Sequence, residues 1–380
     1  MTVSLPEFSC PDCGSPVDPD QTACSNCTGL LRRSGKEVMV YGYRYGEPFS
    51  LRADCSEPVF SFYSVDQCNR RLQVALMTRR CPFECSYCGI RLNGLSERPA
   101  TTTLLDQLGS ALVKFEGQAV DVLAIGCEGS MFDHRAIQPD ALWQLISVAK
   151  ARLPSSQVQL ETRADLIRED VIRRLQCALN GRLGIKTSLE TLDDRVRNHV
   201  LEKRLSLPSF ERGMISCFRY LVPVAVFVMV KPHYAMTEQD GLREAMETCD
   251  YLIDFAERHS GSISIRLSAT YPVRGTPWGN EAYARKYLPP EITTMAAVGL
   301  HCAERGVPVS ISLWEEQLCD IDDTFWSHET STILGFNRIL RFTQTQNTSL
   351  LHDVLNGSCG TDPRRGSEKL VLLKPPTLSQ

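Results

Sequence analysis

The sequence contains no hydrophobic run long enough to cross a membrane. The longest apolar stretch, residues 220–230, contains Pro223 and ends at Lys231, which is typical of a buried strand. The first residues show no charged region followed by an apolar stretch, so we expect no secretory leader. Basic charge is not in excess either, because the formal net charge is −4 and the pI is near 6.0. These absences predict a cytoplasmic globular protein without a membrane segment and do not indicate a basic nucleic-acid-binding protein.

Cysteine, in contrast, is abundant, with 16 residues in the chain. Without a leader, reduced metal-binding thiols are a more consistent interpretation than disulfides. Cys81, Cys85 and Cys88 form a C-x3-C-x2-C run, with Tyr87 directly before the last cysteine. A structural zinc site takes four protein ligands, and the nearest further candidate, Cys68, lies 13 residues upstream. Three thiolates without a fourth suit a [4Fe–4S] cluster that keeps one iron open, and three unrelated core cysteines are the alternative.

A second group of cysteines lies near the amino terminus. Cys10 and Cys13 form one C-x2-C pair, and Cys24 and Cys27 form another after a short turn-rich loop. Two such pairs predict a tetrathiolate zinc ribbon over residues 1–30, with a rubredoxin-like iron or an auxiliary iron–sulfur cluster as alternatives. Metal binding would provide most of the folding free energy of so small a segment. The ribbon could dock a substrate or a partner protein, or it could brace the fold.

The rest of the chain alternates strand-like and helical patterns. Candidate strands lie at 73–78, 121–126, 157–161, 183–190, 224–231 and 263–270. Amphipathic stretches lie near 102–116, 138–152, 164–179, 207–218 and 239–259, and a helix near 290–306 and a strand at 307–313 follow. This alternation predicts βαβ units, a parallel sheet and an α/β fold. We expect a connecting region with short strands near 38–41 and 59–63 over residues 31–70, a barrel-like domain over 71–315, and a carboxyl-terminal extension with a loose tail over 316–380.

The cysteine run resembles the signature of the radical S-adenosylmethionine (radical SAM) enzymes. The resemblance implies a partial (β/α)6 barrel in which Cys81, Cys85 and Cys88 bind three irons and the fourth iron chelates SAM. It also implies that the reduced cluster cleaves SAM to a 5′-deoxyadenosyl radical, which abstracts a hydrogen from the substrate. An electron donor such as flavodoxin or ferredoxin would supply the electron. Tyr87 would pack beside the adenine, although a tyrosine here could equally be ordinary core.

Motifs at the strand ends, where βα folds place their sites, resemble the branch that includes the elongator catalytic subunit. Gly129 and Ser130 follow the second strand in a turn that resembles the element holding the SAM amino group. The usual form is Gly-Gly-Glu-Pro, and a plain tight turn is the alternative. Glu161 and Arg163 end the third strand and resemble a Glu-Ser/Thr-Arg element. Its arginine would approach the SAM carboxylate, and a surface ion pair is the alternative.

The later strand ends extend this resemblance. Ser188 and Glu190 lie in a run similar to a Gly-Leu-Glu-Thr/Ser element, which implies that Glu190 sits by the SAM ribose or amino group. Gly275 lies in a run that resembles a Gly-Thr element at the adenine edge.

Two lysines are candidate catalytic residues. Lys186 stands where the resembled family usually has a neutral residue, so it either contacts substrate or pairs with Glu161. Lys231 ends an apolar strand and lies either in the mouth of the barrel or with its ammonium in solvent.

The motifs across residues 70–315 are most similar to the radical SAM subfamily that makes archaeosine in transfer RNA. This resemblance implies a modified nucleobase or nucleoside as substrate, either free or in tRNA. An enzyme of secondary metabolism or sulfur insertion with an auxiliary cluster is the alternative, and a SAM-binding scaffold or sensor is a third. The auxiliary cluster would draw on the unassigned cysteines Cys55, Cys68, Cys302, Cys319 and Cys359.

Overall fold

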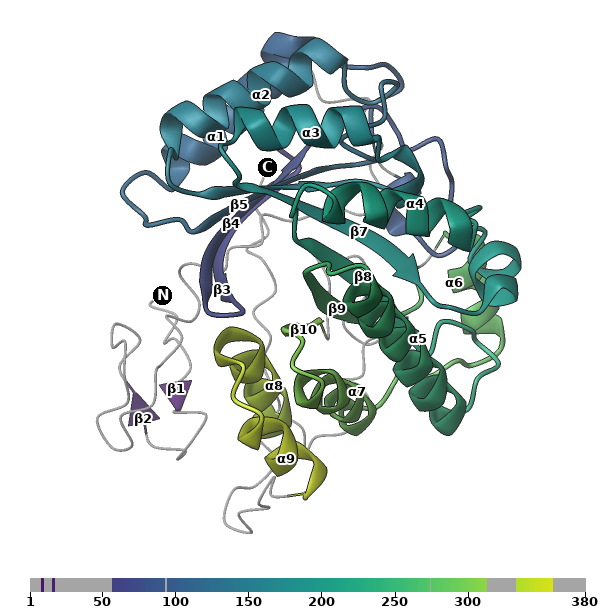
Figure 1. The fold of residues 1–380 in the computed structure, drawn as a ribbon. Helices are drawn as coiled ribbons and strands as arrows, with labels where there is room; N and C mark the ends of the chain where they lie inside the picture. The colour runs from purple at the N-terminus through teal and green to yellow at the C-terminus, as the bar shows by residue number, and fades with distance from the viewer. Residues whose placement is uncertain are drawn as a thin grey trace, which may run out of the picture.

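A curved eight-stranded sheet forms the centre of the protein (Figure 1). The computed structural model describes residues 8–9, 16–17, 57–92, 94–273, 275–312 and 333–357. The strands are β3 (Phe60–Asp66), β4 (Asn69–Leu76), β5 (Val122–Cys127), β6 (Gln157–Glu161), β7 (Leu183–Glu190), β8 (Val224–Val230), β9 (Ile263–Ala269) and β10 (Val309–Ser312). Their hydrogen-bonded order is β10-β9-β8-β7-β6-β5-β4-β3. Strands β4 to β10 are parallel, and β3 pairs antiparallel with β4 at one edge.

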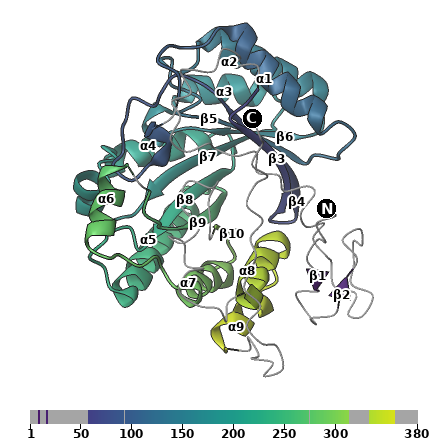
Figure 2. The same ribbon diagram turned by 180° about the vertical axis from the view of Figure 1, so that it is seen from behind.

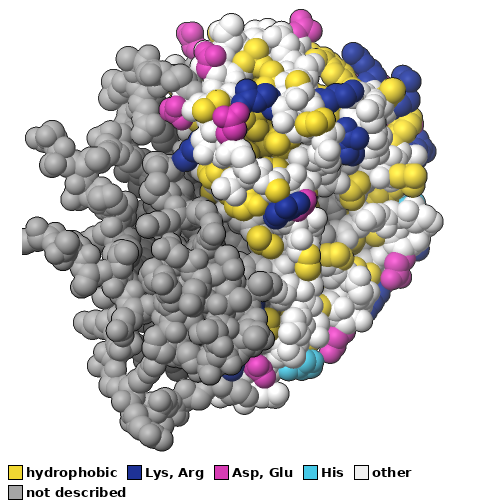
Figure 3. All heavy atoms as spheres, turned by 90° about the vertical axis from the view of Figure 1, so that its left-hand side faces the viewer, with side chains coloured by type: hydrophobic (Ala, Val, Ile, Leu, Met, Phe, Trp, Pro, Cys, Tyr) yellow, Lys and Arg dark blue, Asp and Glu magenta, His cyan; other side chains and the backbone are white. Residues whose placement is uncertain are grey.

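Helices connect the strands and cover the outside of the sheet (Figures 1 and 2). They are α1 (Thr101–Lys114), α2 (Pro139–Arg152), α3 (Glu169–Ala178), α4 (Leu207–Phe218), α5 (Glu238–Arg258), α6 (Pro277–Ala284), α7 (Ile292–Glu304), α8 (Ile333–Thr345) and α9 (Ser349–Leu355). Lys114, Lys150 and Arg152 lie in the last turns of α1 and α2, where they complement the helix dipoles. On the face shown in Figure 3, Lys and Arg side chains gather in the upper right part, with hydrophobic side chains interspersed.

Side chains alternate between an apolar outer face and a polar inner face of the sheet. In β9 the isoleucines and the leucine are buried in the main core, whereas the intervening Ser264, Arg266 and Ser268 are partly exposed. The same alternation separates Arg71 and Gln73 of β4 from the core leucines and valine of that strand. The outer face therefore supplies the hydrophobic stabilisation, and the inner face carries the polar groups.

Polar contacts join the two edges of the sheet, β3 and β10. Asp66 on β3 forms an ion pair with Arg266 at 2.8 Å and accepts the hydroxyl of Ser310 on β10 at 2.5 Å. Helix α8 lies across the same junction, because the carbonyl of Thr343 accepts the N–H of Gln67 at 2.8 Å. We call this junction the seam. No backbone ladder joins β3 to β10 among the described residues, so the side-chain contacts of the seam close the barrel-like sheet.

The predicted strands correspond to observed ones. The six candidates match β4 to β9, and the predicted strand at 307–313 matches β10. The prediction of an α/β partial barrel is therefore confirmed. Strand β4 begins earlier than expected, at Asn69, and it ends at Leu76, so that Thr78 lies in the following loop. The edge strand β3 runs to Asp66, beyond the expected 59–63.

Three helices were absent from the sequence prediction. Helix α6 follows a run that we interpreted only as the end of a strand. Thr276 caps it by accepting the N–H of Gly279, and Pro277 occupies its first turn. Helices α8 and α9 lie in the stretch expected to be a weakly patterned extension. The domain boundaries themselves remain predictions.

The amino-terminal segment contributes two short strands. β1 (Phe8–Ser9) pairs antiparallel with β2 (Pro16–Val17). The predicted ribbon ligands Cys10, Cys13, Cys24 and Cys27, and the strand expected at 38–41, lie outside the described residues. The zinc ribbon therefore remains a prediction. In the described part of the chain, every helix is too short or too polar to span a bilayer.

Candidate active site

The three cysteines of the C-x3-C-x2-C run lie in the loop after β4, at the carboxyl end of the sheet. Ser86 fixes this cysteine loop near its middle. Its N–H donates to the carbonyl of Leu201 at 2.9 Å, and its hydroxyl donates to the carbonyl of Val200 at 2.6 Å. Its own carbonyl accepts the N–H of Trp278 at 3.0 Å. Two segments far along the chain thus hold the loop in place.

The donor set of this loop fits an iron–sulfur cluster. Cys81, Cys85 and Cys88 form no disulfide and are partly exposed. Burial raises the pKa of the Cys81 thiol, while backbone N–H groups of the loop and the nearby Arg163 oppose that rise and favour the thiolate. Within the described residues, no three His, Cys, Asp or Glu side chains stand close enough to hold one metal ion. A structural zinc site takes four protein ligands, whereas a [4Fe–4S] cluster can be held by three thiolates with one iron left open, so the three cysteines of this loop suit a cluster.

Two arginines stack on Phe83, which lies between the first two cysteines. The guanidinium carbon of Arg163 is 3.9 Å from the ring centroid, and that of Arg135 is 5.1 Å away. Each guanidinium is oriented by a carboxylate, Arg163 by Asp165 and Arg135 by Asp133. Such cation–π contacts strengthen when the groups are desolvated, and Arg163 is buried. Asp165 and the carbonyls of Lys203 and Arg204 already bind the Arg163 guanidinium. Its contact with the SAM carboxylate therefore remains a prediction.

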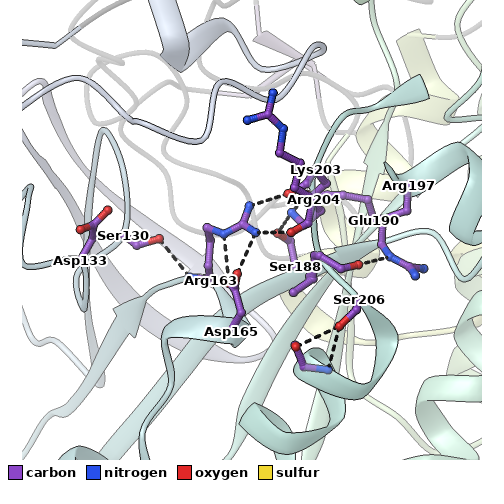
Figure 4. Close-up of polar contacts among 12 residues, drawn as sticks. Ser130, Asp133, Arg163, Asp165, Ser188, Glu190, Arg197, Lys203, Arg204 and Ser206 are labelled. Carbon is purple, nitrogen blue, oxygen red and sulfur yellow. Dashed lines mark hydrogen bonds and ion pairs between the residues drawn. The ribbon is translucent and has the colours of Figure 1, made fainter. Parts of the chain in front are cut away.

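A second set of contacts holds the other end of the cysteine loop, and Figure 4 shows its members Ser188, Glu190 and Lys203. The Tyr87 hydroxyl donates to Oε1 of Glu190 at 2.7 Å. The ammonium of Lys203 lies 2.8 Å from the same oxygen and 2.6 Å from Oγ of Ser188. Burial raises the pKa of Tyr87 well above its usual value and the Glu190 carboxylate adds to the rise, so the phenol keeps its proton and donates it in a hydrogen bond.

The position of Glu190 depends on an irregularity in β7. The register of β7 against β8 shifts between Ser188 and Glu190, as in a β-bulge. Glu190 also adopts a φ of 72°, an uncommon conformation for a residue with a side chain. Bulges occur next to active sites because they redirect a side chain. Here the bulge brings Glu190 to Tyr87 of the cysteine loop.

The glycine-rich turn after β5 lies beside the first cysteine. A Cβ added to Gly129 would stand 3.9 Å from Cα of Cys81. Oγ of Ser130 accepts the backbone N–H of Arg163 at 3.1 Å, which joins this turn to the end of β6. The turn therefore places backbone groups next to the cysteine loop, where the resemblance expects the amino group of SAM.

Glu128 in the same turn is a buried acid that the sequence analysis did not single out. Its Oε2 accepts the N–H of Thr78 at 3.3 Å. Its Oε1 has no hydrogen-bond partner among the described residues. Burial raises the pKa of Glu128 to about 8, against the opposing effects of Thr78 and Arg80. A neutral carboxyl group therefore stands at the base of the cysteine loop.

Lys186 and Glu161 form an ion pair on the inner face of the sheet. The ammonium lies 2.9 Å from Oε2 of Glu161 and 4.6 Å from the ring centroid of Phe227. The Lys186 side chain is only 7% exposed, whereas that of Glu161 is 36% exposed. Of the two roles that the sequence left open for Lys186, the structure therefore shows the pairing with Glu161. One member of the pair remains open to solvent.

Lys231 and Gly275 stand apart from these contacts. The Lys231 ammonium lies 2.9 Å from both Glu238 and the carbonyl of Leu288, so it neither reaches solvent freely nor contacts the cysteine loop. Its catalytic role remains a prediction that none of these contacts supports. Gly275 donates its N–H to Oδ1 of Asn280 at 3.3 Å, next to the start of α6.

Sequence reasoning assigned no role to Lys203. The residue lies in a polar turn between the π-helical turn Val196–Val200 and α4, where a lysine usually faces solvent. The one signal was its position, 13 residues after Glu190 of the Gly-Leu-Glu-Thr/Ser-like run. Contacts with Glu190 and Ser188 in β7 could not be inferred from that spacing.

No protein-family model matches the chain. In sequence, the chain is similar to archaeosine synthase subunit beta from Methanosarcina acetivorans, with 26% identity over 221 residues. The match covers 56% of this chain and 62% of that relative, so the chain spans about three fifths of the relative's length. Among solved structures, it is similar to queuine lyase from Clostridium spiroforme bound to SAM and queuine, with a TM-score of 0.40 and 18% identity over 58% of this chain and 83% of that one. It is also similar to methylornithine synthase, with a TM-score of 0.44 and 11% identity over 68% of this chain and 76% of that one.

The strand order and the cysteine loop fit the predicted α/β partial barrel, and the sequence similarity supports the resemblance that the motifs indicated. One relative, archaeosine synthase subunit beta, falls in the subfamily that the strand-end motifs resemble.

Proposed function

We propose that the protein is a radical SAM enzyme. The observation that carries this proposal is one loop with three cysteines outside any disulfide, held at one end by Phe83 and Arg163 and at the other by Tyr87 and Glu190. Its cysteines would bind a [4Fe–4S] cluster with one open iron, and SAM would bind beside it. When bound, these groups supply a 5′-deoxyadenosyl radical that takes a hydrogen from the substrate.

The chain's own residues would orient SAM. Both protein contacts to Glu190 use Oε1, so Oε2 is open to a hydroxyl or ammonium donor of the ligand. The backbone around Gly129 and Ser130 lies next to Cys81 and would meet the amino group. Arg163 would approach the carboxylate from its position over Phe83. Gly275 would lie at the adenine edge.

Lys186 would act on the substrate rather than on SAM. It lies on the polar inner face, paired with Glu161 and stacked on Phe227. A buried ammonium beside a half-open carboxylate can hold a proton for, or return one to, a nitrogen or oxygen of the substrate. Lys231 is the second candidate for this proton-transfer role. In the structure its ammonium contacts Glu238 and the carbonyl of Leu288.

The substrate would be a modified nucleobase, and we favour one carried in RNA. The name of the relative that makes archaeosine supports a base of this kind. Several exposed basic residues lie in the segments that follow β4, β7 and β9. Among the described residues they have no ion-pair partner, and they are Arg79, Arg80, Arg98, Arg195, Arg204 and Lys286. They can contact phosphates locally, even though the whole chain carries a net charge of −4.

An auxiliary cluster has less support among the described cysteines. Cys302 is fully buried and hydrogen-bonded to Cys249, and Cys68 is exposed with its thiol on the carbonyl of Thr345. Cys55, Cys319 and Cys359 lie outside the described residues. We further propose a small electron-transfer protein as reductant and a zinc ribbon that contacts a partner protein or the substrate.

Anaerobic reconstitution tests the proposal. The full chain should bind about four irons at the cysteine loop and about one zinc ion at the ribbon, and dithionite plus SAM should release 5′-deoxyadenosine. Replacing Cys81, Cys85 or Cys88 with Ala should abolish that product, whereas Cys10→Ala or Cys24→Ala should lower only the zinc content. Wild-type protein with an intact cluster and no 5′-deoxyadenosine would contradict an enzymatic role. Comparing tRNA with the free nucleoside as substrate then separates the two substrate classes.

A further inference from the structure

Lys203 is a buried cation whose contacts all lead to the cysteine loop or to the strand end beside it. Its side chain is 4% exposed. Its ammonium contacts Oε1 of Glu190 at 2.8 Å, Oγ of Ser188 at 2.6 Å and the Tyr87 hydroxyl at 3.4 Å. An ammonium has three N–H donors, so these acceptors use its full capacity. Lys203 thus has no donor left for a ligand.

The backbone of Lys203 supports the opposite end of the same loop. Its carbonyl accepts Nη1 of Arg163 at 3.0 Å, and Arg163 stacks on Phe83. In Figure 4, Lys203 lies between Arg163 and the Ser188–Glu190 pair. One residue therefore connects the Phe83 side of the cysteine loop with its Tyr87 side.

The backbone around Lys203 is held in an uncommon conformation. Glu202 has a φ of 50° and Arg204 has a φ of 53°, both in the left-handed region that favours glycine. Strain of this kind persists only where the surroundings impose it, and it concentrates at functional sites. Lys203 lies between the two strained residues, so its side chain and its carbonyl reach different partners.

We infer that Lys203 is a positioning residue that orients the Glu190 carboxylate toward a ligand, so that Oε1 is used by the protein and Oε2 is presented to a hydroxyl or ammonium donor. The inference rests on the proposed function, because the ligand would be SAM. Without the ammonium, Glu190 would keep only the phenol of Tyr87 as a partner and could turn either oxygen inward. The loop contacts through the Lys203 carbonyl would remain, because they do not involve the side chain.

The test compares Lys203→Met with Lys203→Arg in the full chain. Lys203→Met should keep the iron content of the wild type but bind SAM about tenfold more weakly or worse, the loss expected for one charged hydrogen-bond arrangement. It should also show a reduced change in the EPR spectrum of the reduced cluster when SAM is added. Lys203→Arg should restore most of the affinity. Lys150→Met is the matched control, because among the described residues the Lys150 ammonium bonds the carbonyl of Ala178, on the outside of the barrel.

A double variant keeps the inference testable if Lys203→Met folds poorly. Glu190→Gln with Lys203→Met removes both buried charges, and its SAM affinity should equal that of Glu190→Gln alone, because Lys203 acts through Glu190. Additive losses would overturn the inference, as would wild-type affinity in Lys203→Met. If the wild-type protein itself binds no cluster and cleaves no SAM, the proposed function fails, and that result is distinct from any behaviour of the variants.

Discussion

The carboxylate of Asp66 on β3 lies 2.8 Å from the guanidinium of Arg266 on β9, although five strands separate β3 from β9 in the hydrogen-bonded order. Arg71 on β4 approaches the same carboxylate at 3.3 Å, and all three side chains are largely buried. Polar side chains on the inner face therefore join the edges of the sheet. The ion pairs serve in place of the backbone ladder that a fully closed barrel would have.

Replacing Asp66 with Asn should destabilise the protein by roughly 3–5 kcal/mol, because two guanidinium groups lose the buried carboxylate that balances them. Burial acts to raise the pKa of Asp66, but Arg266 and Arg71 hold it below its ordinary value. The stabilisation is thus complete above about pH 4 and is lost as the pH falls through the lowered pKa. Denaturant unfolding at several pH values measures both effects. Asp121→Asn, in the more exposed pair with Arg70, should cost less than about 1 kcal/mol; equal costs would contradict a special role for the seam.

Gln346 binds the backbone of β10 at the edge of the sheet. Its side-chain carbonyl accepts the N–H of Val309 at 2.8 Å, and its amide donates to the Val309 carbonyl at 2.7 Å. Gln346→Ala should lower the free energy of unfolding by about 1–3 kcal/mol, since it leaves two backbone groups without these partners. Gln344→Ala is the control, because the Gln344 side chain makes no such bond among the described residues. Thermal unfolding that shifts equally in both variants would show that the amide is dispensable.

Lys186→Gln should separate SAM cleavage from substrate chemistry. Iron content and substrate-free release of 5′-deoxyadenosine should match the wild type, because Lys186 contacts Glu161 and Phe227 rather than the cysteine loop. Product formation should fall by about a hundredfold or more, the usual effect of losing a general acid or base. Chromatographic assay of both products measures the ratio. Arg219→Gln, which breaks an exposed pair with Glu169, should leave both unchanged. Full product formation by Lys186→Gln would assign the lysine to stability alone.

Glu128 should make stability depend on pH between about 5 and 8. Burial raises its pKa in the folded state to about 8, whereas the unfolded chain releases the proton near its ordinary value of 4.5. Within that window the folded state holds the extra proton, so this group lowers stability as the pH rises, by at most about 1.4 kcal/mol per pH unit. Glu128→Gln should therefore gain stability relative to the wild type on going from pH 5 to pH 8. Urea unfolding of the metal-free chain checks this expectation, with the exposed Glu116→Gln as control. A constant difference across the window would mean that Glu128 is ionised in the fold.

Much of the barrel could be predicted from the sequence because its strands are local patterns. The apolar run of β8 and the alternating apolar and polar residues of β9 predict buried strands. The cysteine spacing identifies the loop that carries the proposed chemistry. Tyr87, Ser130, Arg163, Ser188 and Glu190 were each placed at a strand end or in the cysteine loop, and the structure brings them around that loop.

The remainder depends on contacts that no local pattern encodes. The seam joins Asp66 to Ser310, which lies 244 positions away in the sequence. Lys203 received no role from the sequence, and the bulge in β7 brings Glu190 to it. Lys231 resembles a site lysine in sequence, yet Glu238 from the following helix occupies its ammonium. Tertiary partners, rather than residue types, decide these roles.

The hydrogen bond between Ser86 and Trp278 sets an order of events during biosynthesis. Trp278 follows Cys88 by 190 positions, so at roughly 5–20 residues per second it leaves the ribosome about 10–40 s later. Through that interval the nascent cysteines emerge without the residue that later holds their loop. Lasting assembly of the proposed cluster would therefore wait for nearly the whole barrel to be translated, and the thiols would pass through a period in which oxidation can reach them.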